Sequence, residues 1–414
     1  MILIKHGLIY KNNVFIKQDV LIDNEKIVEI APNIDPTNQK TVIDAHDMIV
    51  VPGFIDMHTH LREPGYEYKE TILTGSMAAA RGGFTTIAAM PNTNPVIDNL
   101  DVINNIKHLI EKAYVKVLLY SSITKMQLGK ELVDFSELAP SVIAFSDDGN
   151  GIQDETLMKE ALENAKAVNK ILVCHCEDQK LIPRGASLHG EKSIPSSSEY
   201  EQVFRDLNLV KEINTRYHIC HVSTKETVAL VRETKKNGLS VTCEVTPHHL
   251  LLCDEDVFID NANFKMNPPL RSEEDKEALI AGLNDGTIDI IATDHAPHSV
   301  AEKNQDFDKA PFGVIGLETC FPVLYTNLVL KKIITLNQLL DALAYKPSEI
   351  FKLQSGIDIG KNADLTLINL KQKQIIDSSL FYSLSRNTPF NGYECNGVIK
   401  FTIVNGKIVY KGDD

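Results

Sequence analysis

Five short apolar segments of this chain, each with the character of a β-strand, end in side chains that can bind a metal ion. They are residues 56–60, 146–149, 174–177, 220–223 and 293–298. Imidazole nitrogen and carboxylate oxygen are ordinary protein ligands of zinc and similar divalent ions. These residue types therefore indicate metal-dependent hydrolysis, in which the ion lowers the pKa of a bound water.

The first segment supplies two ligand candidates. Side chains alternate faces along a strand, so His58 and His60 should point the same way, with Thr59 on the opposite face. Two histidines held only by local hydrogen bonds are the alternative. A strand entered through Pro52-Gly53 gives them the position that a ligand pair requires.

His175 and His221 each end another apolar strand. A single histidine at such a place is more often a core residue, but both occupy the same strand-end position as the first pair. Strand alternation should turn the neighbouring cysteines, Cys174, Cys176 and Cys220, away from the histidines. We therefore expect these thiols to pack against helices rather than to bind zinc.

Two carboxylates complete the set. Residues 147–149 also fit an ordinary turn, but a carboxylate that bridges two ions would hold them together, and Asp148 is the candidate for that role. Asp294 ends a strand of Ile and Ala, where an unpaired carboxylate would be costly to bury. A ligand or catalytic role is therefore favoured for Asp294.

These segments recur in a pattern of alternating strands and helices between residue 53 and about 347, which indicates parallel βαβ units. Because the active site of a (β/α)8 barrel forms where its strands end, an apolar run followed by a ligand is the expected order. The eight expected strands are 53–60, 85–91, 115–121, 142–147, 171–176, 217–222, 240–246 and 288–294.

Both ends of the chain contain short strands without helical periodicity, and Asn405-Gly406 is a strong hairpin signal. The expected strands are 2–4, 14–16, 20–22, 26–30, 48–51, 365–368, 397–404 and 407–410. We therefore predict an α/β protein with two parts. A TIM-type (β/α)8 barrel spans 53–352, and a small β-sandwich domain is built from 1–52 plus 353–414.

Composition excludes several classes of protein. The net charge of −14 argues against a nucleic-acid surface. No segment approaches the length of a membrane span, and the N-terminus lacks the apolar core of a signal peptide. The seven scattered cysteines fit reduced thiols, so we expect a cytoplasmic protein.

Seven motifs spread over nearly the whole chain closely resemble the bacterial class I dihydroorotases of the amidohydrolase superfamily. They are residues 53–65, 90–93, 146–149, 174–178, 220–224, 265–271 and 293–298. The resemblance implies reversible hydrolysis of L-dihydroorotate to N-carbamoyl-L-aspartate in de novo pyrimidine (UMP) biosynthesis. It also implies one or two zinc ions per subunit, with two favoured, and a homodimer.

The resemblance assigns the metal ligands residue by residue, with Asp294 also acting as the catalytic proton carrier. Many superfamily members bridge two ions with a carbamylated lysine, but no lysine lies between Lys130 and Lys159. This departure matches class I and weighs against a hydantoinase. The implied ligands are His58, His60 and Asp294 for one zinc ion, His175 and His221 for the second, and Asp148 between them.

The resemblance also assigns substrate contacts. Arg62 suits a substrate carboxylate because a guanidinium makes two parallel, charge-assisted hydrogen bonds. Ordinary alternatives stay open: Arg62 in a surface ion pair, Asn92 and Asn267 as turn residues beside prolines, Gly313 as a loop glycine. The implied substrate-binding residues are His60, Arg62, Asn92, Asn267, His298, Phe312 and Gly313.

Two other functions are alternatives. An allantoinase-type cyclic amidase would share the barrel, but Arg62, Asn92 and His298 answer a carboxylate that allantoin lacks. A non-catalytic scaffold for aspartate transcarbamoylase would have no reason to keep six ligands, although an active enzyme could also associate with that partner. The stretch 179–199 departs from the family pattern, so substrate access or subunit contacts could differ there.

Overall fold

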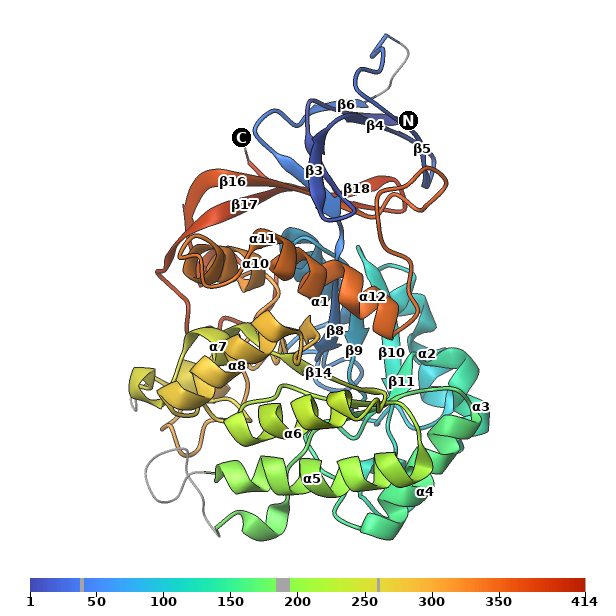
Figure 1. Ribbon diagram of the computed structural model, residues 1–414, viewed down its shortest axis with the longest axis vertical. Helices are drawn as coiled ribbons and strands as arrows, with labels where there is room; N and C mark the ends of the chain where they lie inside the picture. The colour runs from blue at the N-terminus through green and yellow to red at the C-terminus, as the bar shows by residue number, and fades with distance from the viewer. Residues whose placement is uncertain (38–40, 184–193, 259–260, 414) are drawn as a thin grey trace.

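The computed structural model describes residues 1–37, 41–183, 194–258 and 261–413 (Figure 1). Eight parallel strands form a nearly closed barrel, and smaller sheets at one end of the molecule contain both chain termini. The predicted fold class is confirmed. The boundaries 1–52 plus 353–414 for the small domain stay a prediction.

The barrel strands follow one another in chain order, and each runs parallel to its neighbour. A parallel bridge from Thr59 to His295 closes the ring, and the amide of His60 donates to the carbonyl of His295 at 2.8 Å. All eight expected strands are present. They are β8 Phe54–Thr59, β9 Phe84–Ala89, β10 Lys116–Ser121, β11 Ala144–Phe145, β12 Leu172–Cys174, β13 Tyr217–Ile219, β14 Val241–Val245 and β15 Ile290–Ile291.

Helices such as α4, α6 and α8 cover the outside of the barrel with one buried face, and Asp154, Thr224 and Ser272 cap their first turns. No described helix is both long and apolar enough to cross a membrane. The helices are α1 Ile72–Arg81, α2 Leu100–Ile110, α3 Phe135–Leu138, α4 Glu155–Ala167, α5 Ser196–Ile213, α6 Lys225–Lys236, α7 Pro247–Leu251, α8 Glu273–Asp285, α9 Val300–Lys303, α10 Cys320–Leu324, α11 Leu336–Leu340 and α12 Lys346–Ile350.

The chain ends form a four-stranded sheet, order β5-β4-β1-β6, and a six-stranded sheet, order β18-β17-β16-β7-β2-β3. Apolar side chains from both sheets, including Ile4, Ile22, Val50 and Leu367, form one buried cluster. Strands β2 and β6 were not predicted from the sequence. The strands are β1 Ile2–Lys5, β2 Leu8–Lys11, β3 Val14–Lys17, β4 Asp19–Asp23, β5 Lys26–Ala31, β6 Thr41–Asp44, β7 Ile49–Pro52, β16 Leu365–Ile375, β17 Glu394–Val404 and β18 Lys407–Lys411.

The barrel and the six-stranded sheet share a second apolar cluster. Phe54 at the start of the barrel stacks on Phe321 of α10 with ring centroids 5.4 Å apart, and Ile399 of β17 belongs to the same cluster. The hydroxyl of Thr366 in β16 donates to the carbonyl of Gly83 at 2.6 Å. These contacts anchor the N-terminal end of the barrel, so its carboxyl end is left for the site.

The β17–β18 hairpin turn tests how tightly the two chain ends pack. Gly406 has φ +70°, and a Cβ there would lie 1.7 Å from the carbonyl oxygen of Asn24. Gly360, with φ +88°, has no atom within 4 Å of an added Cβ, so it shares the backbone strain without the clash. We expect Gly406→Ala to be less stable than Gly360→Ala by about 1–3 kcal/mol. Urea unfolding of both variants measures this difference, and equal midpoints would contradict the contact.

Candidate metal centre

The carboxylate of Asp148, just after β11, lies among three histidines at the carboxyl end of the barrel. Its Oδ1 is 3.3 Å from His58 Nε2 and 3.5 Å from His221 Nε2. Its Oδ2 is 3.4 Å from His60 Nε2. Asp148 therefore lies between the histidines of β8 and the histidine after β13, as a bridging ligand must.

The other two candidates complete a group on each side. Asp294 Oδ1 is 3.0 Å from His60 Nε2, and His175 Nδ1 is 3.0 Å from His221 Nε2. Within each group the ligand atoms lie within 4.8 Å of one another, and all the residues are buried. The groups are His58, His60 and Asp294 on one side, and Asp148, His175 and His221 on the other.

The donor atoms suit a cation. Among the described residues, His58 Nε2 and Asp148 Oδ1 are buried without a hydrogen-bond partner. A buried polar atom left unpaired costs about 1–3 kcal/mol, and more when charged. Although burial opposes the shift, Asp148 and Glu244 raise the pKa of His58, so two carboxylates favour positive charge at this position. Nitrogen and carboxylate donors around such a point fit a divalent metal ion.

Glu244 in β14 contacts the ligand candidate His58 and was not predicted from the sequence. Its Oε1 is 2.5 Å from His58 Nδ1, and its Oε2 is 3.1 Å from His218 Nε2. Despite burial, these histidines lower the pKa of Glu244 to about 2, so it is a carboxylate that accepts the Nδ1 proton of His58. That tautomer leaves Nε2 free to bind a metal. The sequence feature that could have indicated Glu244 is a single charged residue inside an apolar strand.

Backbone irregularities aim the ligands. The register between β8 and β9 shifts between Asp56 and Thr59, which is one extra residue in β8. Met57 belongs to an apolar cluster inside the barrel. The extra residue forms a β-bulge, which allows the next residue, His58, to reach the same interior side. Simple alternation, on which the sequence prediction relied, describes the strand only as far as the bulge.

The prediction for the cysteines is correct for two and wrong for the third. Cys174 and Cys176 belong to the apolar cluster that the barrel shares with the six-stranded sheet, and Cys176 Sγ lies 3.4 Å from the Tyr217 hydroxyl. Cys220 instead lies in the apolar cluster inside the barrel, and its Sγ is within 4.8 Å of ligand atoms of His58 and Asp148. The residue after it, His221, has φ +30°, which reverses the alternation so that consecutive side chains both face inward.

Three of the predicted substrate-binding residues lie beside the first metal group. Asn92 Oδ1 accepts from His60 Nδ1 at 2.8 Å, which orients that imidazole. Arg62 Nε donates to the Pro297 carbonyl at 3.2 Å, and its Nη2 is 3.5 Å from His298 Nε2. Arg62 is thus held inside the site rather than in a surface ion pair.

The remaining predicted contacts come from two loops. Asn267 Nδ2 donates to Glu177 Oε2 at 2.8 Å, and Glu177 Oε2 is 3.6 Å from His175 Nε2. The Phe312 carbonyl is 2.7 Å from His298 Nε2. Gly313 has φ +135°, and an added Cβ would come within 2.8 Å of Ala296 Cβ, so this close approach requires glycine. Asn267 therefore flanks the second metal group, and Phe312 flanks His298.

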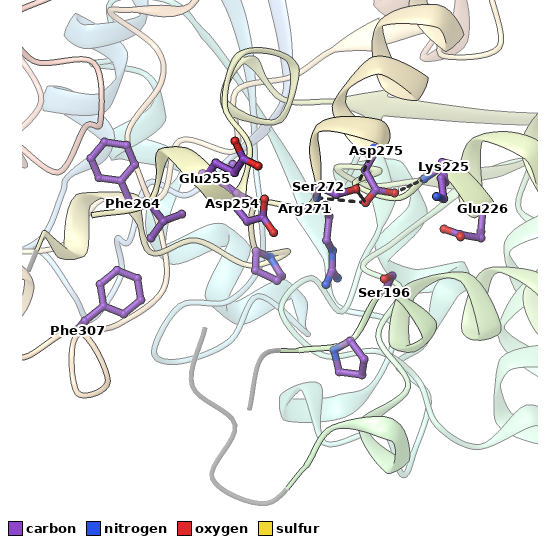
Figure 2. Close-up of a pocket in the computed structure, with 14 residues that line it drawn as sticks. Ser196, Lys225, Glu226, Asp254, Glu255, Phe264, Arg271, Ser272, Asp275 and Phe307 are labelled. Atoms are coloured by element: carbon purple, nitrogen blue, oxygen red, sulfur yellow. Dashed lines mark hydrogen bonds between the residues drawn. The ribbon is translucent and has the colours of Figure 1, made fainter. Parts of the chain in front are cut away.

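A cavity of about 680 Å³ adjoins the loop that carries Asn267 but contains none of the predicted ligands. Figure 2 shows Phe264 and Phe307 at one end, and Ser272, Asp275 and Lys225 linked by hydrogen bonds at the other. It is a neighbouring feature rather than the metal centre. Of the atypical 179–199 stretch, residues 184–193 lie outside the described residues.

Known proteins resemble this chain in sequence and in fold. The family profile described as dihydro-orotase-like matches residues 47–227. A dihydroorotase from Shouchella clausii is 51% identical and covers 97% of this chain and 96% of its own length. One from Staphylococcus aureus is 50% identical and covers both chains completely. The solved L-hydantoinase (dihydropyrimidinase) of Arthrobacter aurescens superimposes with a TM-score of 0.91 at 27% identity, covering 100% of this chain and 96% of its own.

The role of Glu244 is testable through metal affinity. Glu244→Gln cannot accept hydrogen bonds from both His58 and His218, so we expect metal affinity to fall about 10- to 100-fold. Asp289→Asn is the matched control. Asp289 lies just before β15, and its carboxylate pairs with Lys235 at 2.6 Å and accepts a hydrogen bond from the amide of Cys243. Elemental analysis after identical dialysis against a chelator compares them. Equal metal retention would contradict the assignment.

Proposed function

The chain belongs to the dihydroorotase family, and on that premise we propose that it hydrolyses L-dihydroorotate reversibly to N-carbamoyl-L-aspartate, a step of de novo pyrimidine (UMP) biosynthesis. The family and the fold support a cyclic amide hydrolase. One observation carries the proposal: the metal-ligand candidates His58, His60 and Asp294 lie beside Arg62, which in turn approaches His298. A hydrolytic centre next to a carboxylate-binding pair fits a cyclic amide that bears a carboxylate.

We infer that the two groups hold zinc, with two ions favoured over one. His58, His60 and Asp294 would bind one ion, His175 and His221 the other, and Asp148 would bridge them. Bound divalent ions supply two kinds of chemistry, lowering the pKa of water and polarising a carbonyl. The absence of lysine between Lys130 and Lys159 supports Asp148 as the bridge.

Asp294 is the proposed proton carrier. Although burial opposes it, His58 and His60 hold the pKa of Asp294 well below its usual value, so the residue is an ionised carboxylate at neutral pH, the form that a general base requires. It would take the proton from the attacking water and deliver it to the ring nitrogen as the amide bond breaks. The residue has φ +47°, and such backbone strain in a residue other than glycine is typical of functional sites.

Recognition of the substrate would rest on Arg62, whose guanidinium can pair with a planar carboxylate. Allantoin has no carboxylate, which favours dihydroorotate over an allantoinase reaction. A scaffold without activity would not need His58 Nε2 and Asp148 Oδ1 to be buried without a hydrogen-bond partner among the described residues. A homodimer and an association with aspartate transcarbamoylase stay predictions.

Parallel assays of the purified protein on dihydroorotate and allantoin test the function. We expect turnover of dihydroorotate only, and a loss of about 10²- to 10⁴-fold in Asp294→Asn, because the amide cannot carry the proton. Asp294→Ala, which also removes a ligand, should lose metal as well. Preference for allantoin would overturn the substrate, and near-normal turnover by Asp294→Asn would overturn the proton carrier.

Arg62→Lys tests recognition separately. An ammonium cannot reproduce the bidentate pairing, so KM for dihydroorotate should rise roughly 10- to 100-fold while metal content stays unchanged. Steady-state kinetics together with elemental analysis measure both quantities. Unaltered KM would mean that Arg62 does not contact the substrate.

A further inference from the structure

His298 has a polar neighbour at each ring nitrogen, and these neighbours come from different parts of the chain. Its Nδ1 lies 3.3 Å from Lys69 Nζ, and its Nε2 lies 2.7 Å from the Phe312 carbonyl oxygen. The residue is buried, and its backbone amide donates to Asn387 Oδ1 at 3.3 Å. The imidazole is therefore held by the protein rather than by bulk water.

The chemistry of these neighbours fixes the position of the proton. A lysine ammonium can only donate hydrogen bonds and a carbonyl can only accept them. Nδ1 of His298 must then be the unprotonated nitrogen, and Nε2 must carry the proton. The 3.5 Å approach of Arg62 Nη2 to Nε2 becomes a contact between two donors rather than a hydrogen bond.

Lys69 is itself held in place. Its Nζ is 2.9 Å from Glu302 Oε1 and 5.5 Å from the ring centroids of both Tyr66 and Tyr68. Glu302 Oε2 accepts from the amide and hydroxyl of Ser299 at 2.9 and 2.8 Å. The ammonium is thus fixed between a carboxylate and the imidazole.

Charged groups on every side of His298 act on its protonation. Arg62, Lys69 and Lys303 are the cations, and Glu302 is the carboxylate, with Oε2 3.9 Å from Nδ1. Burial and the three cations lower the pKa of His298 to about 2. Because Lys69 pairs with both Glu302 and Nδ1, removal of its ammonium would leave that carboxylate as the next partner for a proton on Nδ1.

We propose that Lys69 is a positioning residue that keeps Nδ1 of His298 free of a proton, so that the neutral ring directs its single N–H at the Phe312 carbonyl and the adjacent carboxylate-binding position. A ring protonated only on Nδ1 would instead turn the lone pair of Nε2 toward two acceptors, the Phe312 carbonyl and the substrate carboxylate. Substrate binding would then be weaker. The substrate part of this inference rests on the proposed function. The protonation part does not.

The ring nitrogens can be observed directly by ¹⁵N NMR of metal-loaded protein labelled at histidine, with His298 assigned from a His298→Gln spectrum. In the wild type we expect Nδ1 to stay unprotonated over about pH 5 to 8. In Lys69→Met the proton of the neutral ring should move to Nδ1, where Glu302 accepts it, so that Nε2 no longer donates. Lys69→Arg, which also only donates, should behave as the wild type, and Lys69→Met with Glu302→Gln should keep the proton on Nε2.

Kinetics provide the second measurement. KM for dihydroorotate should rise about tenfold in Lys69→Met, with kcat within about twofold, and Lys69→Arg should restore KM. Lys346→Met, at an exposed pair with Glu349, is the control and should change neither. A protonated Nδ1 in the wild type, or an unchanged His298 signal in Lys69→Met, overturns the proposal. Wild-type protein that does not turn over dihydroorotate would overturn the proposed function while leaving the NMR result in force.

Discussion

The burial of several carboxylates at one end of the barrel is the constraint on which the rest of the site depends. Asp148, Glu244 and Asp294 are all buried, and each lies within 3.5 Å of at least one histidine nitrogen. Such charges are tolerated only when cations or strong donors surround them. The histidines, the tautomer of His58 and the irregular strand ends are all ways of meeting that requirement.

The architecture was predictable because it follows from pattern. Apolar runs at regular intervals gave all eight barrel strands, and the three- and four-residue apolar spacing of segments such as 155–168 gave the helices between them. Ligand candidates lay where strands end, which a barrel requires. Asn405-Gly406 correctly indicated the hairpin between β17 and β18.

What the sequence could not give depends on tertiary structure. Cys220 was expected to face the helices, but the +30° φ of His221 appears in no local pattern, and it turns both residues inward. Glu244 was overlooked because its partners, His58 and His218, are distant in sequence or on another strand. The contact between Lys69 and His298 likewise joins residues 229 positions apart.

The closure of the barrel has a consequence for how the protein is made. His60 and Asp294 are separated by 234 residues, and the first and last strands are joined by the bridge between Thr59 and His295. The N-terminal strand β7 in turn pairs with β16, which is synthesised near the end. Contacts of such long range form late and slowly. A nascent chain on the ribosome therefore exposes unpaired strands, and it cannot complete the group of His58, His60 and Asp294 until Asp294 has emerged, which leaves apolar strand edges open to aggregation during synthesis.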